Sequence, residues 1–329
     1  MEKITMAHGS GGKSGAELMA RIFGKHFKNE ILDKMEDAAV LEINGRIAFS
    51  TDTFVVTPTI FKGGDIGKLC ICGTVNDLLM MGAVPKYLTC GFVLEEGLDV
   101  ELLDKIVESM AATAKKAGVT IVAGDTKVVE GHGGIFINTT GIGIIPEGRD
   151  ISASNCKAGD KLILSGTLGD HHACILSARM NVENNIKSDC AVLAPICNAL
   201  FDGGIEVRTM RDVTRGGLGT ILNEIARSSS VHINLEEESI PVSDEVSGFC
   251  GIMGLDPLYM GNEGKMIIVV PGEKADEALE LVRGTEEGKN AAIIGTVTEE
   301  KKASVTMTTR LGGSRIVDVL YGEGLPRIC

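Results

Sequence analysis

The chain consists of two runs of alternating strands and helices, and this alternation limits the folds open to it. A polar segment with Pro, Gly and Ser, residues 146–159, separates the runs. Its 329 residues suit two domains of ordinary size. We therefore expect an α+β fold with mixed sheets and packed helices, with domains at 1–150 and 151–312 and a flexible tail at 313–329.

Apolar, β-branched runs predict the strands, and apolar residues at helical spacing predict the helices. In the first half, strands are expected at Arg46–Ser50, Phe54–Thr57, Lys86–Leu94, Thr120–Ala123 and Ile135–Ile145, and helices at Asp65–Met81 and Asp99–Ala117. In the second half, strands are expected at Lys161–Ser165, Met266–Val270 and Ala291–Val297, and helices at Ala173–Ala178, Ala191–Leu200, Leu218–Ser228 and Ala275–Arg283.

The charge and the apolar residues exclude several classes of protein. A net charge of −13 argues against nucleic-acid binding, but a phosphorylated ligand remains possible if metal ions neutralise its phosphates. No N-terminal signal segment and no apolar run near 18 residues is present, so we expect no membrane association and a cytoplasmic protein. The nine cysteines are scattered without CxxC spacing, so they are expected to be reduced.

The sequence ends in Pro326-Arg327-Ile328-Cys329, which places a thiol beside the terminal carboxylate. A chain end is usually loose, so this thiol is either an irrelevant terminus or a nucleophile or attachment point that can move between sites. The carboxylate should raise the pKa of the thiol, and Arg327 should partly offset that effect. Cys329 would therefore need another group to activate it or load it.

Four aspartates lie next to apolar runs, and the last three of them stand beside Thr, Asn or Gly residues: Asp37, Asp52, Asp77 and Asp125. One such aspartate is usually a cap or a turn residue. Four together indicate a set of hard oxygen ligands, which suits Mg²⁺ bound to phosphates. Their long spacing leaves open whether they meet in the fold.

Two glycine-containing motifs could bind phosphate. The stretch His8-Gly9-Ser10-Gly11-Gly12-Lys13 precedes a helix but lacks P-loop spacing, and a flexible linker is the alternative. Arg211-Asp212-Val213-Thr214-Arg215-Gly216-Gly217 opens a predicted helix, where it could bind an anion or simply cap the helix. Glu263, in Asn262-Glu263-Gly264-Lys265, is a candidate general base or a surface-turn residue.

In combination, these motifs resemble the HypE family of carbamoyl dehydratases in NiFe-hydrogenase maturation. The resemblance covers the whole chain in matching order and includes Ser50-Thr51-Asp52-Thr53, Gly73-Thr74-Val75-Asn76-Asp77, Gly124-Asp125-Thr126-Lys127 and the terminal Pro-Arg-Ile-Cys. It implies a two-domain fold like that of aminoimidazole ribonucleotide synthetase. It also implies a homodimer formed by the first-half sheets, with ATP at the subunit interface.

The resemblance further implies a reaction and its residues. A carbamoyl group on Cys329 is phosphorylated by ATP and dehydrated to a thiocyanate. The implied catalytic residues are Cys329, Glu263 and Lys127, the nucleotide-binding residues are Gly11, Gly12, Thr51, Thr53, Asn76, Thr126 and Arg215, and the Mg²⁺ ligands are Asp37, Asp52, Asp77, Asp125 and Asp212. The implied partners are the carbamoyltransferase HypF and the cyanide-accepting HypC–HypD complex.

Two other functions remain open at this stage. A small-molecule kinase or synthetase of the same superfamily would share the aspartates and the fold but would not need a terminal cysteine. A passive thiol carrier would explain Cys329 but would give the Asp, Gly and Arg motifs no task.

Overall fold

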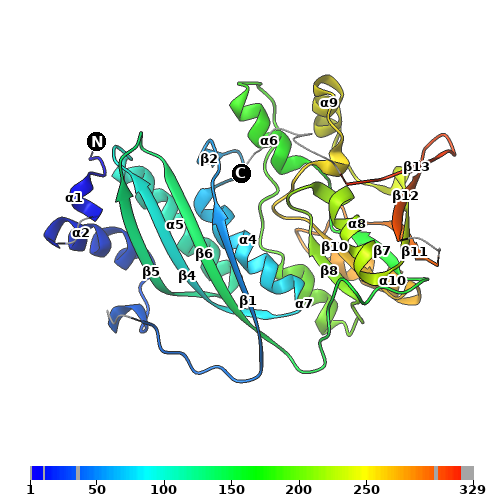
Figure 1. The fold of residues 1–329 in the computed structure, drawn as a ribbon, viewed down its shortest axis with the longest axis horizontal. Helices are drawn as coiled ribbons and strands as arrows, with labels where there is room; N and C mark the ends of the chain where they lie inside the picture. The colour runs from blue at the N-terminus through cyan, green and yellow to red at the C-terminus, as the bar shows by residue number, and fades with distance from the viewer. Residues whose placement is uncertain (1, 10–11, 35–37, 300–302, 320–329) are drawn as a thin grey trace.

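In a computed structural model, which describes residues 2–9, 12–34, 38–299 and 303–319, the chain forms two sheet-containing domains side by side (Figure 1). The first domain contains a four-stranded sheet in the order β1-β6-β4-β5. Its elements are α1 (Met6–Gly9), α2 (Gly12–Leu18), α3 (Gly24–His26), β1 (Arg46–Phe54), β2 (Ile60–Phe61), β3 (Gly64–Asp65), α4 (Ile66–Met80), β4 (Val84–Glu95), α5 (Val100–Ala117), β5 (Thr120–Val129) and β6 (Ile135–Ile145).

Two helices cover one face of this sheet, and their ends follow from their capping residues. The Asp65 carboxylate accepts a hydrogen bond from the Lys68 N–H at 2.9 Å, which starts α4. Helix α5 ends at Gly118, whose φ of 70° is the left-handed conformation that glycine adopts without strain. Nearly every residue of α4 is buried, because the helix lies between the first sheet and the second domain (Figure 1).

The opposite face of the sheet is uncovered by the described residues. Strands β1 and β6 are antiparallel and bury alternate residues, so every second side chain points to this face. Large apolar side chains remain exposed there, including Phe49 at 64%, Ile47 at 50%, Val93 at 38% and Val129 at 39%. A soluble domain rarely leaves such a surface bare, so this open face is a candidate interface.

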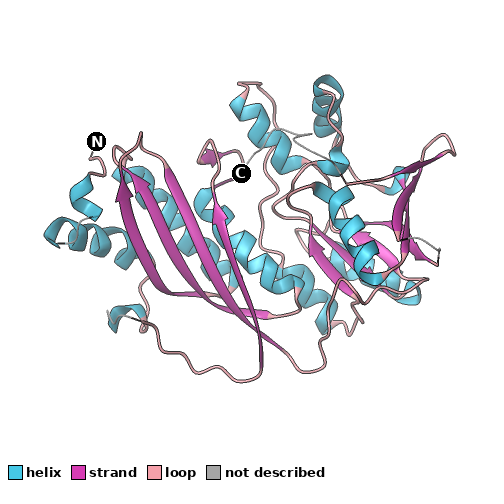
Figure 2. Ribbon diagram, in the orientation of Figure 1, coloured by secondary structure: helices cyan, strands magenta, loops and turns pink. Residues whose placement is uncertain are grey.

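The second domain is a seven-stranded sheet in the order β13-β12-β9-β11-β7-β10-β8, with helices packed against it (Figure 2). Within this second sheet, the β12–β9 pair is parallel and the other described strand pairs are antiparallel. Its elements are β7 (Lys161–Leu164), α6 (Asp170–Arg179), α7 (Ala194–Asp202), β8 (Thr209–Asp212), α8 (Gly217–Ser229), β9 (His232–Glu236), α9 (Asp244–Met253), β10 (Met266–Val270), α10 (Ala275–Arg283), β11 (Ala292–Thr298), β12 (Ser304–Thr308) and β13 (Ser314–Ile316).

Several strand and helix boundaries predicted from the sequence differ from those in the structure. Asp52 and Asp125 lie inside β1 and β5 rather than at strand ends, because both strands run straight through their polar motifs. Arg211 and Asp212 end strand β8, and the helix begins only at Gly217. Strand β13 extends the second sheet to residue 316, into the stretch expected to be tail.

The two domains meet along α4, which contacts β8 and α7. No described helix is long and apolar enough to cross a membrane.

Candidate functional site

Three of the predicted metal ligands converge where the domains meet. Asp52 comes from β1, Asp77 from α4 and Asp212 from the end of β8. The Ser50 hydroxyl donates a 2.6 Å hydrogen bond to the Asp77 carboxylate, which ties β1 to α4. Gly73, one turn before Asp77, makes room for this approach, since a Cβ there would lie 3.9 Å from Asp52 Oδ2 and 2.7 Å from the Phe54 ring.

The electrostatics of this carboxylate cluster, Asp52, Asp77 and Asp212, confirm that its members are neighbours. Burial and the charge of Asp77 raise the pKa of Asp212 to about 6. Burial and Asp52 likewise raise the pKa of Asp77. Arg215 lowers the pKa of both Asp52 and Asp77 without cancelling the effect of burial, so the cluster favours an added positive charge.

Glu263 lies near this cluster, on the loop that precedes β10. Burial raises its pKa well above the usual range, as do Cys190 and the Asp189, Asp212 and Asp52 carboxylates, although the side chain keeps a partial opening to the surface. A carboxyl group with a raised pKa is a suitable proton acceptor near neutral pH.

The buried Asn262 holds the Glu263 loop in place. Its Oδ1 accepts from the Gly169 N–H at 2.8 Å, and its Nδ2 donates to the Val213 carbonyl at 3.1 Å. Val213 directly follows Asp212, so Asn262 connects the Glu263 loop to the carboxylate cluster. Neither this role nor that of Ser50 was predicted, although both residues stand within motifs that the sequence singles out.

A second group of predicted residues lies on the far strand of the first sheet. Asp125 is exposed and forms an ion pair with Lys127 at 2.7 Å, and that pairing lowers the pKa of Asp125. The Thr126 N–H donates to the Asp125 carboxylate at 2.9 Å. Three strand spacings separate β5 from β1, which is roughly 14 Å, so one chain does not bring Asp125 to the carboxylate cluster.

Strand register places Thr53 and Asp125 on the same open face. Thr53 pairs with Asn138, Asn138 with Gly91, and Gly91 with Asp125. On that face Asn138 donates to the Thr53 hydroxyl at 2.9 Å, and the neighbouring Thr140 hydroxyl donates to Thr51 at 2.9 Å. The open face therefore has a polar centre beside its apolar side chains.

Asn76 has a packing role in the structure. It is 3% exposed, and its side chain donates to the Ala191 carbonyl and accepts from the Leu193 N–H, each at 2.9 Å. Both ends of the amide are thus used within the chain. Gly12 begins α2, and the preceding α1 packs against β5, on the Asp125 side of the sheet.

Gly11, Asp37 and Cys329 lie outside the described residues. The described residues end at Val319. The Tyr259 hydroxyl donates to the Asp318 carbonyl at 2.9 Å, and Tyr259 stands four residues before Glu263. Ten residues, 320–329, follow Val319, so Cys329 can reach up to about 35 Å from that point.

The described residues contain no group of three His, Cys, Asp or Glu side chains that could hold a metal ion by themselves. The carboxylate cluster still suits Mg²⁺, because this ion is commonly held by one or two carboxylates, waters and substrate phosphates. The raised pKa values of Asp77 and Asp212 show uncompensated negative charge that such a cation would offset.

The eight cysteines of the described chain are all buried and unpaired. Burial raises the pKa of Cys90 and of Cys197 to about 12 and that of Cys250 to about 11. These thiols stay protonated at neutral pH and are poor nucleophiles.

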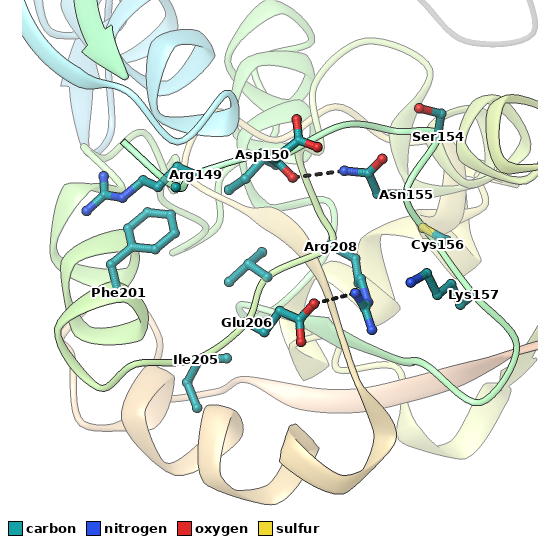
Figure 3. Close-up of a pocket in the computed structure, with 13 residues that line it drawn as sticks. Arg149, Asp150, Ser154, Asn155, Cys156, Lys157, Phe201, Ile205, Glu206 and Arg208 are labelled. Atoms are coloured by element: carbon teal, nitrogen blue, oxygen red, sulfur yellow. Dashed lines mark hydrogen bonds and ion pairs between the residues drawn. The ribbon is translucent and has the colours of Figure 1, made fainter. Parts of the chain in front are cut away.

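A pocket of about 450 Å³ lies elsewhere, along the segment that joins the domains (Figure 3). Two of the cationic side chains that line it are engaged within the chain: Arg208 pairs with Glu206, and Arg149 stacks 3.8 Å above the Phe201 ring. The residues that line this pocket do not include Asp52, Asp77 or Asp212.

Comparison with known proteins covers nearly the whole chain. Residues 35–145 match the family model of the AIR synthase related protein, N-terminal domain, and residues 157–308 match that of its C-terminal domain. The carbamoyl dehydratase HypE of Azotobacter vinelandii is 48% identical over 99% of this chain and 97% of its own length.

Two solved structures are also similar. A crystal structure of hydrogenase maturation protein HypE in complex with ATP has a TM-score of 0.95 and 44% identity, covering 98% of this chain and 99% of that chain. A HypE–HypF complex structure has a TM-score of 0.81 and 48% identity, covering 92% of this chain and 99% of that chain. The chain therefore belongs to the HypE family of carbamoyl dehydratases, within the AIR synthase related proteins.

Proposed function

We propose that this protein dehydrates a carbamoyl group carried on Cys329 to a thiocyanate at the expense of ATP, and so supplies the cyanide ligand in NiFe-hydrogenase maturation. The observation that carries the proposal is the meeting of Asp52, Asp77, Asp212 and Glu263 at the domain boundary, in a chain 48% identical to a carbamoyl dehydratase. The buried internal cysteines leave the terminal thiol as the natural carrier.

The proposed reaction has two steps. The carboxamide oxygen of the S-carbamoyl group attacks the γ-phosphorus of ATP, so an O–P bond forms, ADP leaves and the nitrogen loses one proton. The C–O bond then breaks, phosphate leaves and the nitrogen gives up its second proton, which forms the C≡N bond. Phosphorylation is needed because an unmodified carboxamide oxygen is a poor leaving group.

Glu263 is the candidate acceptor for the amide protons, since burial and the neighbouring carboxylates raise its pKa and make it a stronger base than an ordinary carboxylate. Lys127 is the candidate to steady charge on the transferred phosphoryl group. Asp52, Asp77 and Asp212, with Asp37 and Asp125, would hold Mg²⁺, which supplies charge neutralisation at the phosphates. Arg215, close to Asp52 and Asp77, suits the same phosphates.

The active form in this proposal is a homodimer with ATP between the chains. The open face exposes Phe49 and Ile47 and has a polar centre at Thr51 and Thr53. Pairing two such faces would cover the apolar side chains and could bring Asp125 and Lys127 of one chain toward the carboxylate cluster of the other. Gly11, Gly12 and Thr126 would complete the nucleotide site, whereas Asn76 supports it from the interior.

The proposed partners follow from the reaction. HypF, found in complex with a similar HypE, would load the carbamoyl group, and a HypC–HypD complex would accept the cyano group.

ATP consumption tests the proposal. The protein carbamoylated at Cys329 should form ADP and cyanated protein in a ratio of about one to one, and the uncarbamoylated protein should form much less ADP. Equal ADP formation with and without the carbamoyl group would indicate a kinase of another substrate. No ADP formation in either state would leave the passive thiol carrier.

A further inference from the structure

A short segment of the second domain between α6 and α7, residues 188–193, lies against α4 of the first domain, and we call it the crossing segment. Asn76 of α4 holds it by two hydrogen bonds of 2.9 Å, to the Ala191 carbonyl and from the Leu193 N–H. Asn76 is the residue before Asp77. The crossing segment is therefore attached directly beside the carboxylate cluster.

The same crossing segment holds the backbone of Glu263 on two sides. The Glu263 N–H donates to Asp189 Oδ1 at 3.1 Å, and the Ala191 N–H donates to the Glu263 carbonyl at 3.4 Å. Gly264 lies so close that a Cβ on it would stand 1.9 Å from the Asp189 carbonyl oxygen. The segment thus links the helix that carries Asp77 to the loop that carries Glu263.

Asp189 is an unusual residue for a purely structural link. Its side chain is 3% exposed, and its second oxygen, Oδ2, has no hydrogen-bond partner within the described structure. Lys265 Nζ lies 3.4 Å from that oxygen and is itself largely buried. A buried ion pair of this kind often adds little to stability, because the two charges lose their hydration.

We propose that Asp189 is a positioning residue for Glu263: its carboxylate fixes the Glu263 N–H and so sets where the proton acceptor stands relative to the carbamoyl group. This inference rests on the proposed function, because it presupposes that Glu263 accepts the proton. Asp189 does not touch the substrate and acts only through Glu263. The Lys265 ammonium, 3.4 Å from Asp189 Oδ2, helps to orient the Asp189 carboxylate.

Two double variants that differ in one hydrogen-bond acceptor test this role. Asp189→Asn with Lys265→Gln replaces the ion pair by two neutral amides and keeps an acceptor for the Glu263 N–H. Asp189→Ala with Lys265→Gln removes that acceptor. Each protein is carbamoylated at Cys329 by the partner carbamoyltransferase, and kcat for water loss and KM for ATP are measured with thermal unfolding alongside.

We expect the Asp189→Ala pair to lower kcat by at least about tenfold, with KM for ATP changed less than about twofold, since small displacements of a catalytic group reduce rates steeply. The double variant with Asp189→Asn should keep most of the wild-type kcat. An equal kcat in the two double variants would overturn the inference. A lower kcat that comes with a comparable rise in KM for ATP would overturn it as well. If the alanine variant does not fold, Asp189→Leu with Lys265→Gln takes its place, because leucine fills a similar volume without accepting from the Glu263 N–H: it should show the same loss of kcat, and an unchanged kcat would overturn the inference.

Glu263→Gln separates this inference from the proposed function. If the wild-type protein shows no ATP-dependent water loss, or if Glu263→Gln keeps the full rate, both the proposed function and the positioning role fail. If wild type is active and Glu263→Gln is inactive while the Asp189→Ala pair turns over normally, only the positioning role fails.

Discussion

The hydroxyl of Tyr259 donates a 2.9 Å hydrogen bond to the backbone carbonyl of Asp318, one residue before the last described residue, Val319. The Tyr259 ring packs so closely on α8 that a Cβ on Gly219 would lie 2.6 Å from it. Tyr259 therefore ties the backbone at Asp318 to α8. The terminal thiol has only ten residues of chain, 320–329, with which to reach its site.

Adding one residue after Cys329 should impair cyano-group formation, because the carbamoyl group must enter a site that receives a chain end. Cys329→Ala should abolish it. Both variants should bind ATP as wild type does, since the proposed phosphate-binding residues lie elsewhere in the chain. Turnover and ATP titrations check this, with Cys90→Ala, a buried internal cysteine, as the control that stays active. An extended chain with the full rate would contradict the prediction.

Asp77→Asn should lose Mg²⁺-dependent ATP turnover and keep its fold. The amide preserves the shape that accepts the Ser50 hydroxyl and removes the charge that attracts the cation. ATP turnover across a Mg²⁺ titration measures the loss, which we expect to be on the order of 100-fold. Asp104→Asn, at an ion pair far from the cluster in the fold, is the matched control. Wild-type Mg²⁺ dependence in Asp77→Asn would show that the cluster does not bind the metal.

Phe49→Glu should disrupt the proposed dimer, because it places a charge at the centre of an apolar contact. An unpaired buried charge costs several kcal/mol, so we expect the dimer Kd to rise by at least about 100-fold, with loss of ATP turnover. Ile252→Glu, on α9, is the control, since Ile252 is 87% exposed and lies away from the open face. Sedimentation velocity of Phe49→Glu and Ile252→Glu shows which variant still forms a dimer. A wild-type protein that is monomeric at tens of micromolar, roughly the upper range for stable dimers, would refute the dimer itself.

His171 should make the protein sensitive to acid. The residue is fully buried, and burial lowers its pKa from 6.5 to about 4. Because the unfolded chain binds the proton more tightly, the stability that neutral His171 contributes is present above pH 6.5 and is lost as the pH falls toward 4. Between pH 7.5 and 4.5, wild type should lose on the order of 2–3 kcal/mol more unfolding free energy than His171→Gln.

Urea unfolding at a series of pH values measures this difference. Burial raises the pKa of Asp170 to about 6, so this carboxyl group makes the folded protein more stable as the pH falls, opposite to His171. Both proteins contain Asp170, so its contribution largely cancels when their pH dependences are compared. His132→Gln, in an exposed loop, should follow wild type. Parallel pH dependences for wild type and His171→Gln would contradict the prediction.

Local patterns in the sequence predicted much of the fold. The strands Ile135–Ile145 and Met266–Val270 and the helix Ala275–Arg283 have the expected bounds, because each has a clear apolar period or a buried run. Helix α9 was missed, since Gly248 and Gly251 weaken its helical pattern. Strand β5 was expected to stop before Gly124, yet it continues, because Asp125 and Lys127 both point to the open face, where polar side chains are tolerated.

The site was predictable only in part. The structure brings together Asp52, Asp77, Asp212 and Glu263, whose roles stay predictions, but strand order places Asp125 at the opposite edge of the sheet. Strand order depends on long-range pairing, which no local pattern encodes. The contact between Asp189 and Glu263 joins residues 74 positions apart, so it also emerges only from the fold.

Mass spectrometry of this protein shows directly whether the terminal cysteine carries the group that is dehydrated. The chain is incubated with its carbamoyltransferase and carbamoyl phosphate, then with ATP and Mg²⁺, and is cut after Glu323 so that Cys329 remains in a usable peptide. We predict a carbamoyl mass increase on the C-terminal peptide, followed after ATP by the loss of one water from the same peptide. A modification that maps to Cys70, Cys72 or any other internal cysteine, or a carbamoyl group that ATP leaves unchanged, would contradict the account.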